Sequence, residues 1–406
     1  MTSLTALGKT DSTPGFEKRG QGRNVIFLFP EVLRPQKANH AHMFELLSKS
    51  LHGYVFTISS QAHQGMRICT FKFYSGKIRQ LSILNWLSRL HAQIVLPIWI
   101  SMNGARVDAI VTYDPYGSGI SGIVLKWILR AKLIVQVMGD YHRLDPNDEL
   151  IGEYGRLRRT GGVFKKSLMK LVLRLSVSAA DAVKVLNKDQ ERFVRNQWPA
   201  KPVFRFADFA ATKYFSSLAT YQGDYLLAVG YPFYRKGIDV LVQAFAGIAD
   251  RYPHMRLRIL GYAPEVELAS YRELAGHSPR IEFIKAGWIE DVGEHMRGCY
   301  GFVHAARSEA MGRVLLEAMA CRKPIASTKT NGGLDYVVDR KTGILCEIDD
   351  VESLASAMSS LLENPEAARR MGIAGFDHLQ VHCSEDRFSE QFISMVQEVT
   401  GASARP

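Results

Sequence analysis

The chain has 406 residues, of which 47% are hydrophobic and 22% are charged. This length exceeds what one hydrophobic core usually supports, and the composition is that of a folded globular protein, so we expect two domains. The net charge of +11 is uneven: residues 1–215 hold 31 basic and 15 acidic side chains, a balance of +16, whereas residues 216–406 hold 20 and 25, a balance of −5. A basic half indicates an anionic partner, such as a membrane surface, a phosphate or a nucleic acid, or else only a solvated face.

Three features argue against a secreted, metal-binding or membrane-spanning protein. Residues 1–22 are rich in Gly, Ser, Thr and Lys and contain no apolar run, which predicts a flexible tail rather than a secretory signal. The five cysteines are scattered and form no Cys-x-x-Cys pair, so we expect no disulfide framework and no metal site, and a cytoplasmic setting fits best. The longest apolar stretch, 81–100, is interrupted by Arg89 and His91, so we do not expect it to span a membrane.

The first half of the chain alternates between short apolar runs and helical patterns. A helical pattern over His42–Leu51 follows the first run. The predicted strands are Asn24–Phe29, Tyr54–Ile58, Ile68–Phe73, Val107–Thr112, Leu133–Val137 and Ala182–Leu186. This alternation predicts βαβ units that build a parallel sheet.

The second half repeats the pattern more clearly. Apolar residues between Ile238 and Ala249 follow the spacing of one helix face, and Val351 to about Thr400 is helical in pattern with a break at Asn364-Pro365. The predicted strands are Tyr225–Val229, Leu257–Leu260, Ile281–Ile284, Gly301–His304, Pro324–Ala326 and Gly343–Cys346. These elements again indicate a parallel sheet covered by helices.

The fold class that we expect is α/β, with two Rossmann-like doubly wound domains that face each other across a cleft. The predicted divisions are a tail at 1–22, an N-terminal domain at 23–215, a C-terminal domain at 216–385, and a C-terminal helix at 386–406 that packs back toward the N-terminal domain. Because ligands bind beyond the carboxyl ends of parallel strands, the cleft is the expected site.

The strongest motif follows the predicted strand Gly301–His304. A turn contains Glu309 and Gly312, and a helix follows that carries Glu317 eight positions after the first glutamate. Free N–H groups at the start of a helix attract phosphate, glycine allows an anion close to the backbone, and carboxylates accept hydrogen bonds from sugar hydroxyls. Taken alone, two glutamates at this spacing also fit an ordinary helix with surface carboxylates.

The longer segment SEAMGRVLLEAMACRKPIASTKTNGGLDYVVDRKTGILCEI, residues 308–348, resembles the signature of glycosyltransferase family 4. Its order matches in the first glutamate, the glycine, the second glutamate, Ala-Met-Ala-Cys, Lys-Pro, Gly-Gly, an acidic residue and Thr-Gly. The resemblance covers about 220–400 well and the N-terminal half loosely. It implies a GT-B fold and retaining transfer of a hexose from a nucleotide diphosphate sugar, with the N-terminal domain binding the acceptor and the C-terminal domain binding the donor.

The resemblance also implies roles for residues of this segment. Glu309 would contact the transferred sugar, and Glu317 would hold the ribose hydroxyls of the nucleotide. The backbone of four successive residues would meet the sugar and the diphosphate: Met311, Gly312, Arg313 and Val314.

A second motif, GYPFYRKG, runs from Gly230 to Gly237 between a predicted strand and a predicted helix. Arg235 and Lys236 would lie at the start of that helix, where two cations are unfavourable without an anion. In the family, such residues stabilise the leaving diphosphate, and Gly230 would lie against the donor. The chain departs from the family in having Tyr231 directly after the glycine, where arginine is common.

The N-terminal half matches the family less well. Asp140, which follows the strand Leu133–Val137, is a candidate polar contact in the active site, and His142 is a weaker one. The family's Gly-Gly pair after the first strand is missing. Three side chains could replace those backbone contacts: Arg34, Lys37 and His40.

Two segments of the N-terminal half could contact a membrane. Residues 78–100 contain Trp86 and Trp99, and residues 156–174 interleave seven Lys and Arg with leucines. A basic amphipathic helix binds anionic lipid, although a packed helix with extended lysines gives the same pattern.

These observations predict a cytoplasmic hexosyltransferase that uses a UDP- or GDP-linked sugar and a glycan or lipid-linked acceptor in bacterial-type polysaccharide or glycolipid assembly. Peripheral contact with an anionic membrane is a further expectation. No Asp-x-Asp run is present, so we expect no metal requirement and no other cofactor, and without an aromatic-basic motif we expect no nucleic-acid partner. The alternatives are an epimerase or phosphorylase of the same architecture and a catalytically silent subunit of a polysaccharide assembly complex.

Overall fold

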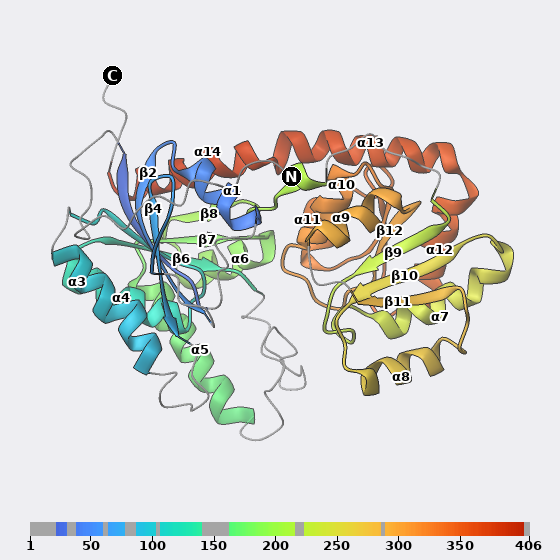
Figure 1. Cartoon of the computed structure of the whole chain (residues 1–406), viewed down its shortest axis with the longest axis horizontal. Coiled ribbons are helices and arrows are strands. Elements are labelled where there is room, and N and C mark those ends of the chain that lie inside the picture. The colour runs from blue at the N-terminus through green and yellow to red at the C-terminus, as the bar shows by residue number, and fades with distance from the viewer. Residues whose placement is uncertain are drawn as a thin grey trace.

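The structure, a computed structural model, describes residues 22–30, 38–59, 64–77, 87–102, 106–139, 162–215, 223–285 and 289–401. They form two α/β domains that lie side by side, as Figure 1 shows. Two consecutive helices at the end of the chain, α13 (Pro365–His382) and α14 (Glu385–Val399), run along one side of both domains.

The N-terminal domain contains an eight-stranded sheet in the order β3-β4-β2-β1-β5-β6-β7-β8. All pairings are parallel except the one between β3 and β4. The strands are β1 (Arg23–Leu28), β2 (Leu51–Ser59), β3 (Gln64–Ile68), β4 (Phe71–Lys77), β5 (Ala109–Thr112), β6 (Lys132–Val137), β7 (Ala182–Val185) and β8 (Val203–Arg205). The strand order reverses between β1 and β5.

The C-terminal domain contains six parallel strands in the order β11-β10-β9-β12-β13-β14. In chain order this is 3-2-1-4-5-6, the doubly wound order of Rossmann domains. The strands are β9 (Tyr225–Val229), β10 (Arg256–Gly261), β11 (Ile281–Lys285), β12 (Gly301–His304), β13 (Ile325–Thr328) and β14 (Ile344–Cys346). The order reverses between β9 and β12, so the two sequence motifs leave the sheet at the same switch point.

Helices cover both faces of the N-terminal sheet. One face packs against Ile100, Leu125, Leu173 and Val177. These residues come from α3 (Leu96–Met102), α4 (Gly117–Leu129) and α5 (Gly162–Ala179), with a π-helical turn (His91–Val95) before α3 and α6 (Lys188–Gln197) nearby. The other face packs against α1 (Ala38–Leu47) and α14. Because β1 is buried on both faces, its residues from Val25 to Leu28 are all apolar.

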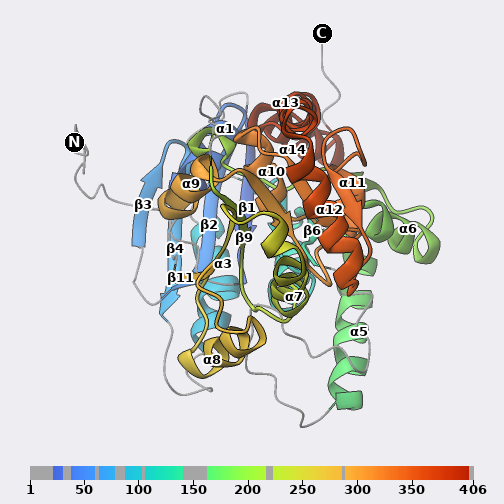
Figure 2. The same cartoon turned by 90° about the vertical axis from the view of Figure 1, so that its right-hand side faces the viewer.

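The C-terminal sheet is covered in the same way. One face packs against apolar residues of α7 and α12, and the other against those of α9 and α10. The helices are α7 (Ile238–Ile248), α8 (Glu265–Leu274), α9 (Ile289–Gly298), α10 (Arg313–Ala320), α11 (Asn331–Tyr336) and α12 (Val351–Glu363). In Figure 2, α7 and α12 lie in front of the sheet, toward the viewer.

The expected α/β class with two parallel sheets is confirmed, and the predicted strands Tyr225–Val229 and Gly301–His304 coincide with β9 and β12. One predicted strand, Ile68–Phe73, is wrong. The run contains a turn at Cys69, whose φ is 47°, and it belongs to two antiparallel strands, β3 and β4. Apolar residues on both sides of the turn concealed it.

Smaller differences between the predicted and the observed elements concern the residues at which helices and strands begin and end. The predicted helix over 42–51 runs from Ala38 to Leu47, and Leu51 begins β2. The three-residue edge strand β8 was not predicted. The C-terminal helical stretch breaks at Asn364-Pro365 as expected, and again at Ser384, whose hydroxyl accepts a hydrogen bond from the N–H of Arg387 and caps α14.

The last two helices connect the domains. Gly372 of α13 lies so close to the C-terminal domain that a Cβ atom would come within 2.0 Å of the Arg322 carbonyl oxygen. Beyond the break, Phe388 and Phe392 of α14 belong to the N-terminal core. Glu385 at the start of α14 accepts a hydrogen bond from the N–H of Lys213 at 2.9 Å and pairs with His42 of α1 at 2.7 Å.

Replacing Phe392 with alanine tests how far the N-terminal domain depends on α14. Phe392 is fully buried and stacks on Phe27 of β1, so the loss of its ring should lower the free energy of unfolding by about 3–5 kcal/mol, as measured by urea unfolding. Gln397→Ala, on the exposed side of the same helix, is the matched control and should change it by less than about 0.5 kcal/mol. Equal stability of the two variants would show that α14 is dispensable.

Candidate active site

Two loops meet at the switch point of the C-terminal sheet. One follows β9 and covers 230–237, and the other follows β12 and covers 305–312. The N–H of Arg307 donates a hydrogen bond to the Arg235 carbonyl at 2.9 Å, which ties the loops together. The predicted motifs therefore share one edge of the sheet, where parallel α/β domains bind ligands.

The first loop brings a lysine over the end of its own strand. Gly230 has a φ of 130°, and a Cβ atom there would come within 2.6 Å of Cε of Lys236. Only glycine fits this conformation and this space, so the lysine can fold back across the strand end.

The second loop brings a carboxylate to that lysine. Nζ of Lys236 and Oε2 of Glu309 are 2.5 Å apart, and their side chains are only 11% and 15% exposed. Gly312, with a φ of 76°, precedes the first residue of α10, and a Cβ atom there would lie 3.3 Å from Cγ of Glu309. The structure thus brings together the predicted residues Lys236, Glu309 and Gly312.

Glu309 is an ionised carboxylate in a buried position. Burial by itself would raise its pKa, but Lys236, His304 and Arg235 together hold the pKa well below its usual value. A carboxylate in this state accepts hydrogen bonds and interacts favourably with positive charge.

His304, the last residue of β12, belongs to the same cluster and was not predicted as a site residue. It is 3% exposed; its Nδ1 is 3.2 Å from the hydroxyl of Ser327, and its Nε2 is 3.8 Å from Oε2 of Glu309. Burial lowers the pKa of His304, although Glu309 opposes this shift, so the ring is neutral at pH 7. A polar residue that ends a buried strand at a switch point is the signal that could have found it.

Arg235 lies within the electrostatic reach of Glu309 and His304. Its Nε is buried and has no hydrogen-bond partner among the described residues. A buried N–H group without a partner costs free energy, which an anion in the site would recover.

Arg307 holds the two loops in place. Its guanidinium donates two hydrogen bonds to Asp239, at 2.8 and 2.7 Å, and lies over the ring of Tyr234, with 4.1 Å to the centroid. The hydrogen bonds to Asp239 raise the pKa of Arg307 above its usual value, so this cation is permanent. It is structural, because its donors are occupied within the protein.

Glu317 is different from Glu309 in its state of charge. It lies in α10, is 8% exposed, and burial raises its pKa to about 7 against the opposing effects of Arg313 and Lys236. Glu317 therefore keeps its proton to a higher pH than an ordinary glutamate does. Hydrogen bonds from ligand hydroxyl groups would favour the ionised form.

The remaining predicted donor contacts lie where α10 meets the linker between the domains. Met311 is buried, and its sulfur accepts a hydrogen bond from the N–H of Asp208 at 3.2 Å. Arg313 is half-exposed and pairs with Asp208 at 3.4 Å, and the same carboxylate pairs with the buried Lys184 at 3.4 Å. Val314 follows in the first turn of α10.

The N-terminal domain contacts the Glu309 loop directly. Nδ2 of Asn187 donates to the carbonyl of Ala310 at 2.8 Å, and the hydroxyl of Tyr336 donates to the carbonyl of Leu186 at 2.7 Å. The N–H of Lys188 donates to Asp335 at 2.7 Å. The candidate site therefore lies next to the interface of the two domains.

Other predicted residues lie outside the described part of the chain. These are Asp140, His142, Arg34 and Lys37. His40 is in α1. Gly139, directly before Asp140, accepts a hydrogen bond from Nε2 of Gln190 at 3.1 Å, which fixes the end of that strand beside α6.

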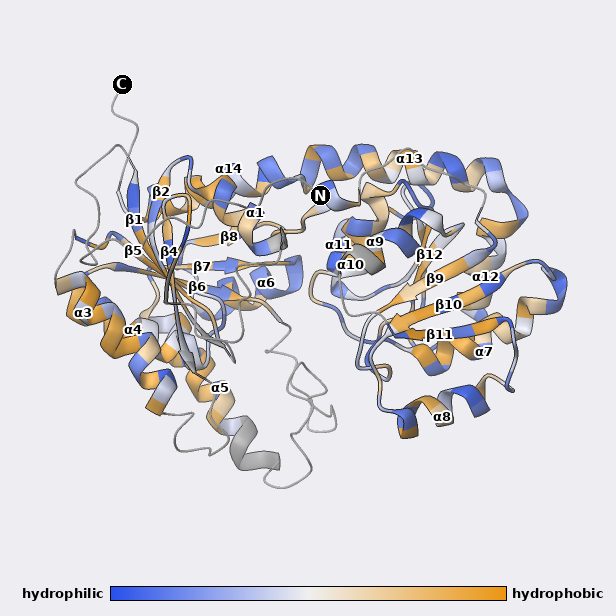
Figure 3. Ribbon diagram, viewed as in Figure 1, coloured by the Kyte–Doolittle hydropathy of each residue, from blue (hydrophilic) through white to orange (hydrophobic). Residues whose placement is uncertain are grey.

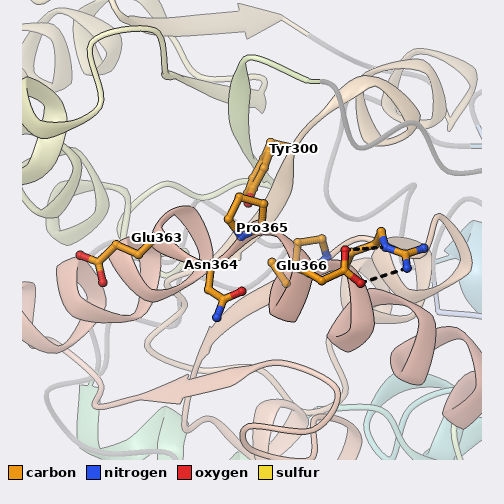
Figure 4. Close-up of a pocket in the computed structure, with 8 residues that line it drawn as sticks. Tyr300, Glu363, Asn364, Pro365 and Glu366 are labelled. Atoms are coloured by element: carbon orange, nitrogen blue, oxygen red, sulfur yellow. Dashed lines mark hydrogen bonds and ion pairs between the residues drawn. The ribbon is translucent and has the colours of Figure 1, made fainter.

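A cavity of about 380 Å³ lies elsewhere in the C-terminal domain. Figure 4 shows Asn364 and Pro365 of the α12–α13 turn beside it. Arg369, which also lines it, donates hydrogen bonds to Glu366. It is also lined by Tyr300 and Pro324, which directly precede β12 and β13. It therefore lies at the amino ends of the strands, opposite the candidate site.

Residues 212–378 match the family Glycosyl transferases group 1, and this range includes both loops and α10. The match spans most of the C-terminal domain and less than half of the chain. A GDP-mannose-dependent alpha-(1-6)-phosphatidylinositol monomannoside mannosyltransferase of Mycolicibacterium smegmatis is 31% identical over 149 residues. The aligned part is 35% of this chain and 39% of that relative's own length.

Two solved structures match most of the chain. Sucrose-phosphate synthase from Thermosynechococcus elongatus has a TM-score of 0.77 at 19% identity, with 94% of this chain and 100% of that chain covered. HepE from Anabaena, in complex with UDP, has a TM-score of 0.67 at 14% identity, with 92% and 100% covered. These likenesses show the fold: two Rossmann-like domains in the GT-B arrangement.

The raised pKa of Glu317 predicts a pH-dependent cost in stability. The folded state binds this proton more tightly than the unfolded chain, whose carboxyl has a pKa of about 4.5, so stability falls as pH rises from about 4.5 to 7. Glu317→Gln removes this cost. We expect it to raise the free energy of unfolding by about 3 kcal/mol at pH 8 and by about 1 kcal/mol at pH 5. Glu352→Gln, on the surface of α12, is the control, and a Glu317→Gln effect independent of pH would contradict the assignment.

Proposed function

We propose that the protein is a retaining glycosyltransferase of family 4 type that moves a hexose from a nucleotide diphosphate sugar to an acceptor. The observation that supports this most strongly is the convergence of Lys236, Arg235 and the start of α10 around the buried Glu309. The match of this region to the group 1 family supports it further.

In this proposal the site stabilises the departing diphosphate. Negative charge grows on the phosphate as the glycosidic bond breaks, and Arg235, Lys236 and the N–H groups at the start of α10 would neutralise it. The acceptor oxygen attacks the anomeric carbon on the face from which the diphosphate leaves, and the leaving phosphate takes the acceptor proton.

A bound donor diphosphate would compete with Glu309 for the positive charge of Lys236. Lys236 is paired with Glu309, whereas Nε of Arg235 has no partner among the described residues. A diphosphate would engage Arg235 first and would then share Lys236. Glu309 would turn to a sugar hydroxyl, which fits its role in the proposal.

The proposed donor is either a UDP-sugar or a GDP-sugar. The M. smegmatis relative is named as GDP-mannose-dependent, and HepE was solved with UDP. A thermal shift measured with UDP- and GDP-sugars separates them, because only the ligand that binds the folded state raises Tm.

The proposed acceptor is a glycan or a lipid-linked glycan of polysaccharide or glycolipid assembly, bound on the N-terminal side of the site. The name of the M. smegmatis relative, a phosphatidylinositol monomannoside mannosyltransferase, supports a lipid-linked acceptor. A cytoplasmic enzyme with peripheral membrane contact fits such a substrate.

Transfer should not require a divalent metal, since Arg235 and Lys236 would supply the positive charge that the diphosphate needs. We expect donor hydrolysis and transfer in 5 mM EDTA to be within about twofold of those in Mg²⁺. A loss of more than tenfold in EDTA, restored by added metal, would contradict this part of the proposal.

Substitution of the central ion pair tests the proposal itself. Lys236→Ala and Glu309→Gln should each lower donor turnover by at least about 10²-fold, because transition-state charge loses its partner. Lys341→Ala and Glu352→Gln, both exposed residues of the same domain, should retain full activity. Product analysis with donor and acceptor measures transfer.

Breaking a buried pair can also unfold a protein. The double variant Lys236→Met with Glu309→Gln removes both charges and keeps the volume, so it should regain stability without regaining activity. Full activity of Lys236→Ala, or of the double variant, would contradict the proposal that Lys236 stabilises the leaving diphosphate.

Two other functions remain candidates. An epimerase or phosphorylase would change the donor or split it with phosphate in the absence of an acceptor. A silent subunit would leave every donor unchanged. The retention of Glu309, Glu317 and the Arg235-Lys236 pair in one cluster favours an active enzyme.

A further inference from the structure

Three helices cover the same face of the N-terminal sheet. The buried residues Ile100 of α3, Leu125 of α4, and Leu173 and Val177 of α5 belong to one core cluster. Figure 1 shows these helices on the outer side of the domain, away from α1 and α14. Their outward surfaces therefore form one continuous side of the molecule, which we name the α3–α5 face.

The α3–α5 face exposes large apolar side chains. Trp99, Met102 and Trp127 are 53%, 79% and 76% exposed, and Figure 3 shows the hydrophobic colouring on α3 and α4. Further members are exposed by 38–53%: Val95, Ile120, Ile128, Leu168, Leu171 and Leu175. A soluble protein rarely gathers so many such side chains on one side without a partner.

Helix α5 shows that this exposure is patterned. Leu168, Leu171 and Leu175 follow one stripe at i, i+3 and i+7, and all three are about half exposed. The opposite stripe, which contains Leu173 and Val177, is buried against the sheet. Over the described side chains 167–179, the helix thus carries an apolar stripe on its outer side as well as on its inner side, which packing within the domain does not require.

Charges on the α3–α5 face are of one sign. The described residues 87–102, 117–130 and 167–179 contain no Asp or Glu, whereas Arg89, Arg130, Lys170 and Arg174 are exposed among them. The nearest carboxylate after α5, Asp181, is already paired with Lys126 and Lys132. The partner of this face must therefore be both apolar and anionic.

We propose that the α3–α5 face lies on an anionic lipid bilayer. Its leucines and tryptophans would enter the boundary between headgroups and acyl chains, and its arginines and lysines would contact lipid phosphates. The helices lie on the bilayer rather than cross it, since none of the described helices is long and apolar enough to span one. A second copy of the chain fits poorly, because two faces of the same charge repel. This inference does not depend on the transferase reaction.

Vesicle co-sedimentation of the full chain tests the apolar part. The wild-type protein should sediment with vesicles of phosphatidylcholine and phosphatidylglycerol and not with phosphatidylcholine alone. Trp127→Glu should weaken binding by about tenfold or more, since a charge replaces a ring that would enter the bilayer. Val266→Glu on α8, where the valine is 85% exposed, is the matched control and should bind normally.

Charge reversal tests the electrostatic part. Loss of one cation near an anionic surface weakens binding by about fivefold, so Lys170→Glu and Arg174→Glu, which also add a negative charge, should each weaken it by more than that. The affinity of the wild-type protein should fall as salt rises from 50 to 500 mM. Arg370→Glu on α13, an exposed cation outside this face, should have no effect. Donor hydrolysis in solution should be unchanged in all these variants, which separates membrane binding from the proposed reaction.

Several results would overturn the proposal. These are no binding to anionic vesicles at low salt, equal binding to neutral vesicles, or equal losses in Val266→Glu and Trp127→Glu. Light scattering that finds a dimer in the wild type and a monomer in Trp127→Glu would assign the face to a second copy instead.

Discussion

A buried carboxylate remains ionised only while cations surround it, and this requirement on Glu309 organises the candidate site. Lys236 reaches it from the other side of the switch point, and that approach depends on the space that Gly230 leaves. Arg307 then holds the two loops at the spacing that the pair needs. The same cations are the groups that a pyrophosphate would bind, so the free site keeps its positive charge in place by pairing it with its own glutamate.

The two glutamates of the signature segment show how position decides chemistry. Glu309 and Glu317 are eight residues apart, yet cations keep the first ionised, while burial raises the pKa of the second to about 7. Glu309 is already paired with Lys236, whereas hydrogen bonds from a ligand would shift Glu317 toward its ionised form.

Sequence reasoning located the C-terminal strands and both loops because parallel strands buried on two faces form short apolar runs that end abruptly. It missed features that depend on distant parts of the chain. The contact of Asn187 with Ala310 and the Lys184–Asp208–Arg313 cluster join segments that are about a hundred residues or more apart, and no local pattern announces them. The turn between β3 and β4 was missed for the opposite reason, because the residues directly before and after it, Ile68 and Phe71, are apolar and read as one strand.

The return of α14 to the first domain has a consequence for biosynthesis. Phe392 of this last helix packs against Phe27 and Phe206, and Phe388 packs against Phe206. While the ribosome is still adding the C-terminal domain, the sheet that emerged first keeps an uncovered apolar strip. The half of the protein that is translated first is therefore completed last, and until then its open core is a target for chaperones.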